Sequence, residues 1–247
     1  MPTEAQAEAA VQAMVDAGQS GVDKDFTPVI GETLTGTDLA DTFNGVLNDD
    51  AGTSTYANGI DTADGGLGDD TYNILVVDAN GQIVLKGTSI EHLIVTNLDG
   101  TDATFNLLGM PDVTAITSLN SSEGMNFDQV QEIVTEVNLI TPTGTNEDLD
   151  ISLAAGTVDP GVTPVEVVVT IDSPDGWQLD YDQNGDDVVT AYTIHAEGDN
   201  DDFELDDLGV LTELTVDGSG SVDFDLQTGT PALATLDAAK LAGGLHF

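Results

Sequence analysis

The 247-residue chain contains no cysteine and no arginine, and its only lysines are Lys24, Lys86 and Lys240. Against these stand 46 acidic residues, which give a formal net charge of −43 at pH 7. A charge of this size and sign repels phosphate backbones and anionic membrane surfaces, which argues against nucleic acid as a partner. Without cysteine no disulfide stabilises the fold, and thiol content says nothing of the redox compartment.

A long apolar run is also missing. The longest, residues 165–171, is interrupted by Glu166 and Thr170 and falls far short of the about 20 apolar residues that span a bilayer. We therefore expect no membrane insertion. No basic region followed by an apolar core opens the chain, so no cleaved secretory signal is visible. Because the chain starts in a helix-like segment and stops inside a repeat, we expect a fragment of a longer protein.

Catalytic motifs are absent as well. The chain has no H-E-x-x-H, no G-x-S-x-G and no cysteine nucleophile. Its three histidines, His92, His195 and His246, are too scattered to indicate a zinc site. Paired acids are abundant, so composition alone leaves a carboxylate hydrolase open. We expect that the chain is not an enzyme.

What the chain does contain is 40% apolar residues with clear strand patterning, which argues for a folded protein despite the charge. Two carboxylates about 4 Å apart repel by about 1 kcal/mol in water and by about 4 kcal/mol near a protein surface. Bound divalent cations would reduce this repulsion. Residues 3–17, ahead of the strands, are predicted to form a short helix, because Thr3 and Gln6 form a capping box and Gly18 follows a stripe of apolar residues. The rest of residues 1–30 is predicted to be a linker.

A glycine- and aspartate-rich stretch carries the first motif. Residues 65–73, GGLGDDTYN, match the nonapeptide G-G-x-G-x-D-x-U-x at every specified position. The glycines permit a tight turn with inward carbonyls, and the aspartate at position six adds a carboxylate, so the turn offers the oxygen ligands that Ca²⁺ prefers. Three degenerate copies stand upstream in the same phase, at 36–44, 45–53 and 56–64.

A second repeat follows the first. Tyr192, Leu214 and Leu236 recur at a spacing of 22, and Phe203-x-Leu205, Phe224-x-Leu226 and Leu245-x-Phe247 recur at 21. Alternating strands at a constant period are expected of a parallel β-solenoid, in which stacked rungs build one core, rather than of the hairpins of a sandwich. We expect solenoid rungs over 31–127 and 189–247, with a β-rich insert at 128–188 between them.

Residues 180–186, DYDQNGD, allow two interpretations. Asp180, Asp182, Asn184 and Asp186 occupy positions 1, 3, 5 and 7 of an EF-hand-like loop, although position 12 is Ala191 rather than glutamate. The dipeptide Asn184-Gly185 is equally a strong type I′ hairpin signal. The two interpretations can coexist. The acidic run 199–207 is more simply a solvated face.

The turns at 35–72, with the downstream phrases IEHLIV, LTELTVDGSGSVDFDL and LATLDAAKLAGGL, resemble the RTX (repeats-in-toxin) family and, within it, the surface-layer proteins of Gram-negative bacteria. The resemblance implies an all-β fold, in which RTX β-roll turns continue into a right-handed parallel β-solenoid. It also implies secretion to the cell surface and a Ca²⁺-dependent coat formed by self-association. The Ca²⁺ ligands that it implies are Asp41, Asp50, Asp61 and Asp70 with backbone oxygens near Gly65, Gly66 and Gly68, and Asp64 is a further candidate.

Three functions remain open from sequence. The leading one is a structural component of a bacterial surface layer, in which Ca²⁺ stabilises the fold and bridges acidic surfaces. The second is an adhesin or matrix protein that binds glycans or cells on the same scaffold. A further partner open from sequence, whichever function holds, is cell-surface glycan or lipopolysaccharide, contacted through regions outside these residues. The third is the non-catalytic C-terminal region of a secreted RTX hydrolase.

Overall fold

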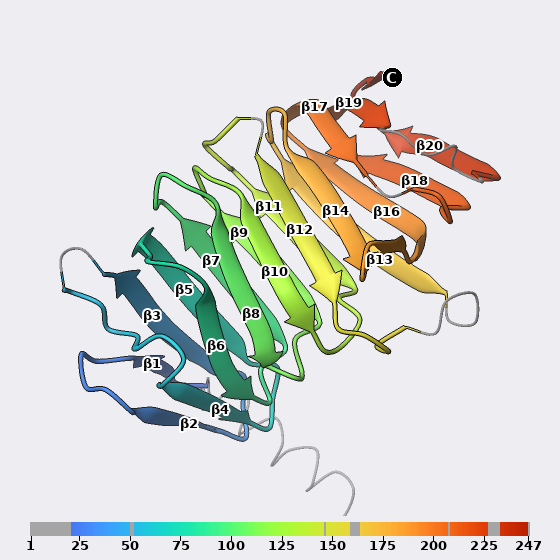
Figure 1. Cartoon of the computed structure of the whole chain (residues 1–247). Helices are drawn as coiled ribbons and strands as arrows, with labels where there is room; N and C mark the ends of the chain where they lie inside the picture. Colours follow the sequence, from blue (N-terminus) through green and yellow to red (C-terminus); the bar gives the residue numbers. More distant parts are fainter. Residues whose placement is uncertain are drawn as a thin grey trace, which may run out of the picture.

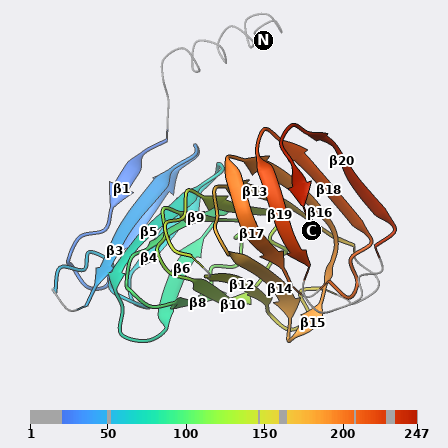
Figure 2. The same ribbon diagram turned by 90° about the horizontal axis from the view of Figure 1, so that it is seen from above.

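The computed structural model describes residues 21–49, 52–145, 147–158, 164–206, 208–226 and 233–246. Within these ranges the protein is all-β and contains no helix; the helix expected at 3–17 lies outside them. Two parallel sheets face each other, and the chain alternates between them, so that each rung supplies one strand to each sheet. Figure 1 shows the rungs stacking in chain order from β1 and β2 to β19 and β20, and Figure 2 shows the stack from above. This confirms the predicted parallel β-solenoid.

The strands are shared between the two sheets. The ten-stranded sheet consists, in order, of β1 (Asp23–Asp25), β3 (Thr42–Asn48), β5 (Thr71–Asp78), β7 (His92–Asn97), β9 (Ala115–Leu119), β11 (Glu136–Ile140), β13 (Val165–Asp172), β16 (Val189–Glu197), β18 (Glu213–Gly218) and β20 (Thr235–Leu241). The eleven-stranded sheet consists of β2 (Thr33–Thr37), β4 (Thr62–Gly66), β6 (Ile83–Thr88), β8 (Ala103–Gly109), β10 (Met125–Val130), β12 (Asp148–Leu153), β14 (Gln178–Gln183), β17 (Asp199–Leu205), β19 (Ser221–Leu226) and β21 (Leu245–His246), with β15 (Asp186–Asp187) paired to β14.

The core is built by alternation along each strand. In β3, for example, every second residue is buried, and the residues between are half-exposed. Because parallel strands align equal positions, buried side chains stack into rows that run through the rungs. Phe105 lies on Phe127 with ring centroids 5.0 Å apart and planes 17° from parallel. Such rows are what a single rung lacks, which is why rungs must stack to be stable.

The observed register confirms most of the predicted period. Tyr192 aligns with Leu214 and Leu214 with Leu236, as their constant spacing predicts. Phe203 aligns with Phe224. The predicted alignment of Leu245 with Phe224, at a spacing of 21, is wrong. Leu245 aligns with Val222, so this rung is longer than expected.

The region 128–188 is β-rich as expected, but it does not interrupt the solenoid. Strands β11 to β14 occupy consecutive places in the two sheets. The rungs here are longer, since Glu136 aligns with Val168 and Leu149 with Leu179, at spacings of 32 and 30 in the numbering. The extra residues lie in the connections between strands, which tolerate insertion at little cost because they run over the surface. Because the connections are longer here, the constant spacing is lost in the sequence, although the strands remain consecutive in both sheets.

Candidate metal sites

The connections that follow the glycine-containing ends of β2, β4 and β6 stack at one edge of the solenoid. We call it the glycine-turn edge and define it by the connections 38–41, 67–70 and 89–91, each of which leads from the eleven-stranded sheet to the ten-stranded one. Asp41 and Asp70 end the first two connections, immediately before β3 and β5, and Glu91 ends the third. Both aspartates are buried, with exposures of 1% and 0%. Pairing of β3 with β5 and of β5 with β7 places the three residues in successive rungs.

These acids form a hydrogen-bonded ladder in which each carboxylate accepts the N–H of the preceding rung. The Val22 N–H donates to Asp41 Oδ1 at 2.6 Å, the Asp41 N–H to Asp70 Oδ1 at 2.6 Å, and the Asp70 N–H to Glu91 Oε2 at 2.8 Å. The ladder satisfies backbone donors that a strand-to-turn transition leaves open. It also brings three like charges together.

Asp41 and Asp70 differ in how well their surroundings stabilise the ionised carboxylate. Burial opposes ionisation of Asp41, but N–H groups of Val22 and Thr37 stabilise its charge and hold its pKa below the ordinary value. For Asp70, burial and then repulsion by Asp41 and Glu91 raise the pKa. Its second oxygen, Oδ2, is buried and has no hydrogen-bond partner among the described residues. A buried carboxylate oxygen without a donor is costly, and a cation would remove that cost.

Glycine is required beside Asp70. A Cβ on Gly65 would lie 1.9 Å from the Ser89 carbonyl oxygen and 2.3 Å from Asp70 Oδ2. Gly66 and Gly68 follow with φ of +95° and +132°, which other residues rarely adopt. The predicted glycine positions therefore lie at the glycine-turn edge with Asp41 and Asp70.

The other predicted ligands of the nonapeptide region lie elsewhere. Asp61 precedes β4, at the opposite end of that strand from Asp70, and is fully buried. Its oxygens accept the N–H groups of Ala57, Gly31 and Glu32 at 2.6, 2.7 and 2.9 Å. Asp64 is half-buried within β4 and accepts from the Thr88 hydroxyl at 3.2 Å. Asp50 lies outside the described residues. The structure thus does not bring Asp61 or Asp64 together with Asp70.

The 180–186 segment is a β-hairpin. Asp182 and Gln183 of β14 pair antiparallel with residues of β15, and the two turn residues Asn184 and Gly185 have φ of +57° and +76°, as a type I′ turn requires. An extended strand spaces alternate residues about 6.6 Å apart, whereas an EF-hand loop curls its ligands around one point. Accordingly, the carboxylate oxygens of Asp180, Asp182 and Asp186 do not all lie within 4.8 Å of one another. One other set of acids among the described residues does meet that distance.

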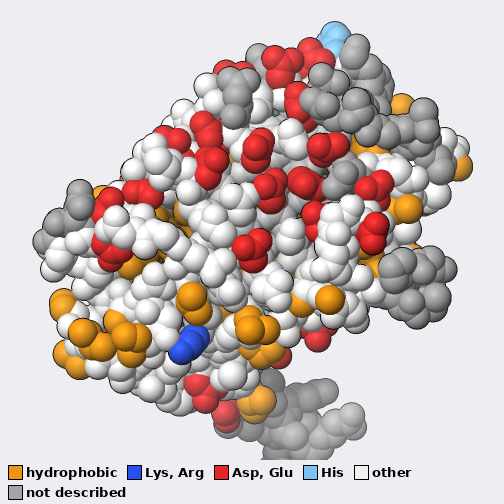
Figure 3. Space-filling model, viewed as in Figure 1, with side chains coloured by type: hydrophobic (Ala, Val, Ile, Leu, Met, Phe, Trp, Pro, Cys, Tyr) orange, Lys and Arg blue, Asp and Glu red, His pale blue; other side chains and the backbone are white. Residues whose placement is uncertain are grey.

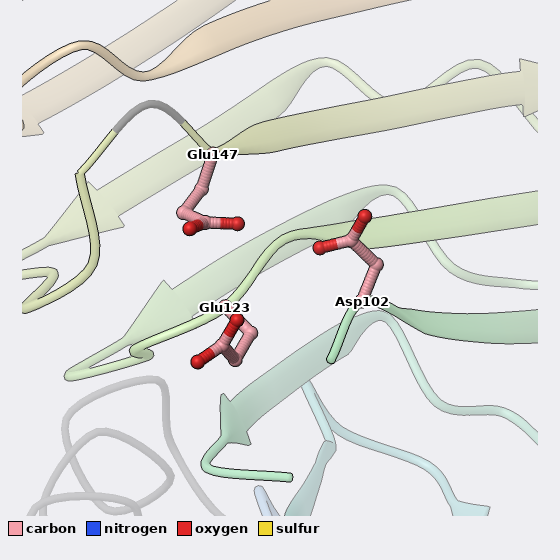
Figure 4. Close-up of side chains that lie close together, drawn as sticks. All are labelled: Asp102, Glu123 and Glu147. Atoms are coloured by element: carbon pink, nitrogen blue, oxygen red, sulfur yellow. The ribbon is translucent and has the colours of Figure 1, made fainter. Parts of the chain in front are cut away.

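That converging set, Asp102, Glu123 and Glu147, was missed by sequence analysis. Each side chain offers one oxygen, and these oxygens lie within 4.8 Å of one another. Asp102 and Glu147 immediately precede β8 and β12, and Glu123 lies two residues before β10, so the three come from successive rungs; Figure 4 shows their carboxylates turned toward a common space. Asp102 and Glu147 both accept the Gly124 N–H at 3.1 Å. Burial, followed by repulsion from Glu123 and Asp102, raises the pKa of Glu147.

The triad borders an acidic face on the outer side of the eleven-stranded sheet. Figure 3 shows carboxylates gathered over β10, β12 and β14, while apolar side chains gather at the other end of the same face. At the centre, burial and the neighbouring carboxylates, Asp148 first, raise the pKa of Asp150 to about 6. We define this acidic face by Asp102, Asp128, Asp148, Asp150, Asp180 and Asp182.

Few basic side chains of the protein lie close to its carboxylates. In the described ranges two histidines contact carboxylates: His92 Nε2 lies 2.8 Å from Asp69 Oδ1, and His195 Nδ1 contacts Asp217 Oδ1. Both histidines are thus surface residues of strands. The single tryptophan, Trp177, is fully buried and donates its indole N–H to the Gly144 carbonyl at 2.9 Å, so it cannot serve as an exposed sugar-stacking surface.

The part of the chain that the structure describes contains no helix that could span a membrane. The chain matches no protein-family model, no curated protein and no solved structure. Function is therefore inferred from the sequence motifs together with the geometry of the described residues.

Proposed function

We propose that this chain is a secreted, structural β-solenoid of a bacterial surface layer and that it binds Ca²⁺. In this proposal Ca²⁺ stabilises the glycine-turn edge and bridges acidic surfaces of neighbouring molecules. The chain's own residues supply a rigid stack of rungs and a surface that only cations can neutralise. No catalytic step is assigned to it.

The observation that supports calcium binding best is the buried, unpartnered Oδ2 of Asp70. It belongs to a ladder of three acids, and a Cβ on Gly65 would contact both this oxygen and the Ser89 carbonyl oxygen. Carboxylate and carbonyl oxygens are the ligands that Ca²⁺ takes. Asp61 fits a cation less well, because three backbone N–H groups already occupy its oxygens. The Asp102–Glu123–Glu147 triad fits a cation through its three converging oxygens.

Isothermal titration calorimetry of chelator-treated protein with CaCl₂ tests this proposal. Asp70→Asn keeps the acceptor for the Asp41 N–H but removes the charge. We expect its Ca²⁺ affinity to fall about tenfold or more, because affinity follows the number of charged ligands. The matched control is Asp69→Asn, which removes an exposed neighbouring charge and should leave the affinity of this site unchanged.

Glu147→Gln serves as the second arm of the same titration. If the triad holds a separate ion, this variant loses a different fraction of the binding signal from Asp70→Asn. Equal titrations for wild-type protein, Asp70→Asn and Glu147→Gln would contradict the proposal at both positions.

A further inference from the structure

We propose that Thr37 determines where calcium binds at the glycine-turn edge: its donors replace an ion at Asp41, so that of the two buried aspartates only Asp70 is a calcium ligand. The inference rests on the proposed function, since it concerns the same calcium site. Two successive turns, 36–41 and 65–70, support it, because they occupy equivalent places in the solenoid but leave their carboxylates in different surroundings.

The two turns are equivalent in position and length. Strand β2 pairs with β4 in a register that sets Thr37 beside Gly66. Asp41 lies four positions after Thr37, Asp70 lies four positions after Gly66, and each aspartate immediately precedes a strand of the ten-stranded sheet. The difference between the two carboxylates therefore arises inside the turns and not from their place in the fold.

The carboxylate of Asp41 is hydrogen-bonded on both oxygens. The Thr37 N–H donates to Oδ2, and the Val22 N–H donates to Oδ1 at 2.6 Å. The Thr37 hydroxyl lies 3.1 Å from each of these oxygens and accepts the Leu39 N–H at 3.2 Å. Hydrogen bonds to an ionised carboxylate are the strong ones. A cation at Asp41 would have to displace donors that already compensate its charge.

The carboxylate of Asp70 has a donor on one oxygen only. The Asp41 N–H donates to Oδ1 at 2.6 Å, but Oδ2 is buried without a hydrogen-bond partner among the described residues. The residue in the place of Thr37 is Gly66, which carries no hydroxyl. Its φ of +95° belongs to a conformation that threonine rarely adopts. Both donors that Thr37 supplies in the first turn are therefore missing from the second.

A carbonyl oxygen completes the surroundings of the open carboxylate. A Cβ on Gly65 would lie 2.3 Å from Asp70 Oδ2 and 1.9 Å from the Ser89 carbonyl oxygen, so these two oxygens border one small space. Carboxylate and carbonyl oxygens together suit Ca²⁺. In the other turn the Gly65 carbonyl oxygen would lie 2.1 Å from a Cβ on Gly36. Because both turns offer a carbonyl, the donors of Thr37 are what distinguishes them.

Asparagine variants, melted in EDTA and followed by circular dichroism, test the two environments without calcium. An amide has one acceptor oxygen, so in Asp41→Asn one of the two N–H groups, of Val22 or Thr37, would face an amide donor. We expect its melting temperature to fall by about 5 °C, because a buried hydrogen bond is lost. Asp70→Asn keeps the acceptor for the Asp41 N–H and turns an amide donor toward the Ser89 carbonyl, so it should melt at or above the wild-type temperature.

Calorimetric titration with CaCl₂ gives the second measurement. Asp41→Asn should bind as many ions as wild-type protein, with affinity within about threefold, because its charge acts on the site only from a distance. Asp70→Asn should lose about tenfold or more in affinity. Thr37→Val removes the hydroxyl and should lower the melting temperature in EDTA without changing the number of bound ions. The matched control is Thr35→Val, on the same exposed side of β2, which should change neither.

Two results would overturn the inference while the proposed function stands. One is the loss of a bound ion in Asp41→Asn, and the other is wild-type melting in EDTA for both Asp41→Asn and Thr37→Val. Should Asp41→Asn not fold, Thr37→Val decides both points. Absence of calcium binding by wild-type protein would instead remove the proposed function and the inference with it, so the wild-type titration distinguishes the two failures.

Discussion

At the scale of single residues, Asp150 of the acidic face should make the stability of the protein depend on pH. Its pKa of about 6 in the folded protein exceeds the about 3.9 of an aspartate in an unfolded chain. A carboxyl whose pKa is raised by folding binds protons more tightly in the folded state. Its ionisation therefore costs stability as the pH rises from about 4 to about 6, and the full cost is present above that window.

We therefore expect calcium-free protein to melt at a higher temperature at pH 5 than at pH 7. Asp150→Asn removes this group's contribution and should reduce the difference, with each kcal/mol corresponding to about 2–4 °C. Asp38→Asn, in an exposed turn, is the matched control and should leave the pH dependence as it is. Melting curves by circular dichroism, kept above the isoelectric point of about 4.1, provide the measurement. An Asp150→Asn profile parallel to wild type would contradict the expectation.

At the scale of elements, the turns at the glycine-turn edge owe their shape to the absence of side chains. We expect Gly65→Ala to destabilise the protein by about 1–3 kcal/mol or more, because its methyl group would overlap the Ser89 carbonyl oxygen and the Asp70 carboxylate. Gly81→Ala is the control. Gly81 has φ of +93°, but an added methyl group there would meet no described atom within 4 Å, so only backbone strain of about 1 kcal/mol applies.

Chemical denaturation measures both variants. The calcium response adds a second readout, since Gly65→Ala disturbs the contact of Asp70 with the turn and should weaken calcium binding, whereas Gly81→Ala should not. Equal destabilisation of the two variants would show that packing around Asp70 does not limit stability.

At the scale of the whole molecule, the acidic face opposes lateral contact between copies. The screening length of about 8 Å at physiological salt means that monovalent ions only soften this repulsion, whereas Ca²⁺ can bridge carboxylates on two molecules. We expect millimolar Ca²⁺ to drive side-by-side association of the protein, measured by light scattering during a titration. NaCl of matched ionic strength is the control, and association driven equally by Na⁺ would reduce the effect to screening.

The sequence by itself determined the fold class, because a rung's pattern is local. Alternating burial along a strand and a return at a constant period are written in positions such as Tyr192, Leu214 and Leu236, and these positions align as expected. The hairpin at Asn184-Gly185 was local as well. The period failed where connections lengthen, as in 128–188, because added surface residues change the count without changing the core.

Only the tertiary structure decided which acids meet. Asp61 and Asp70 are nine positions apart in sequence, but β4 lies between them and carries them to opposite edges. Asp102, Glu123 and Glu147 lie far apart in sequence, yet two successive rungs of unequal length place them at one point. The pKa of Asp150 depends on carboxylates from several strands. Convergence depends on the summed length of every intervening strand and turn, a quantity that no single motif contains.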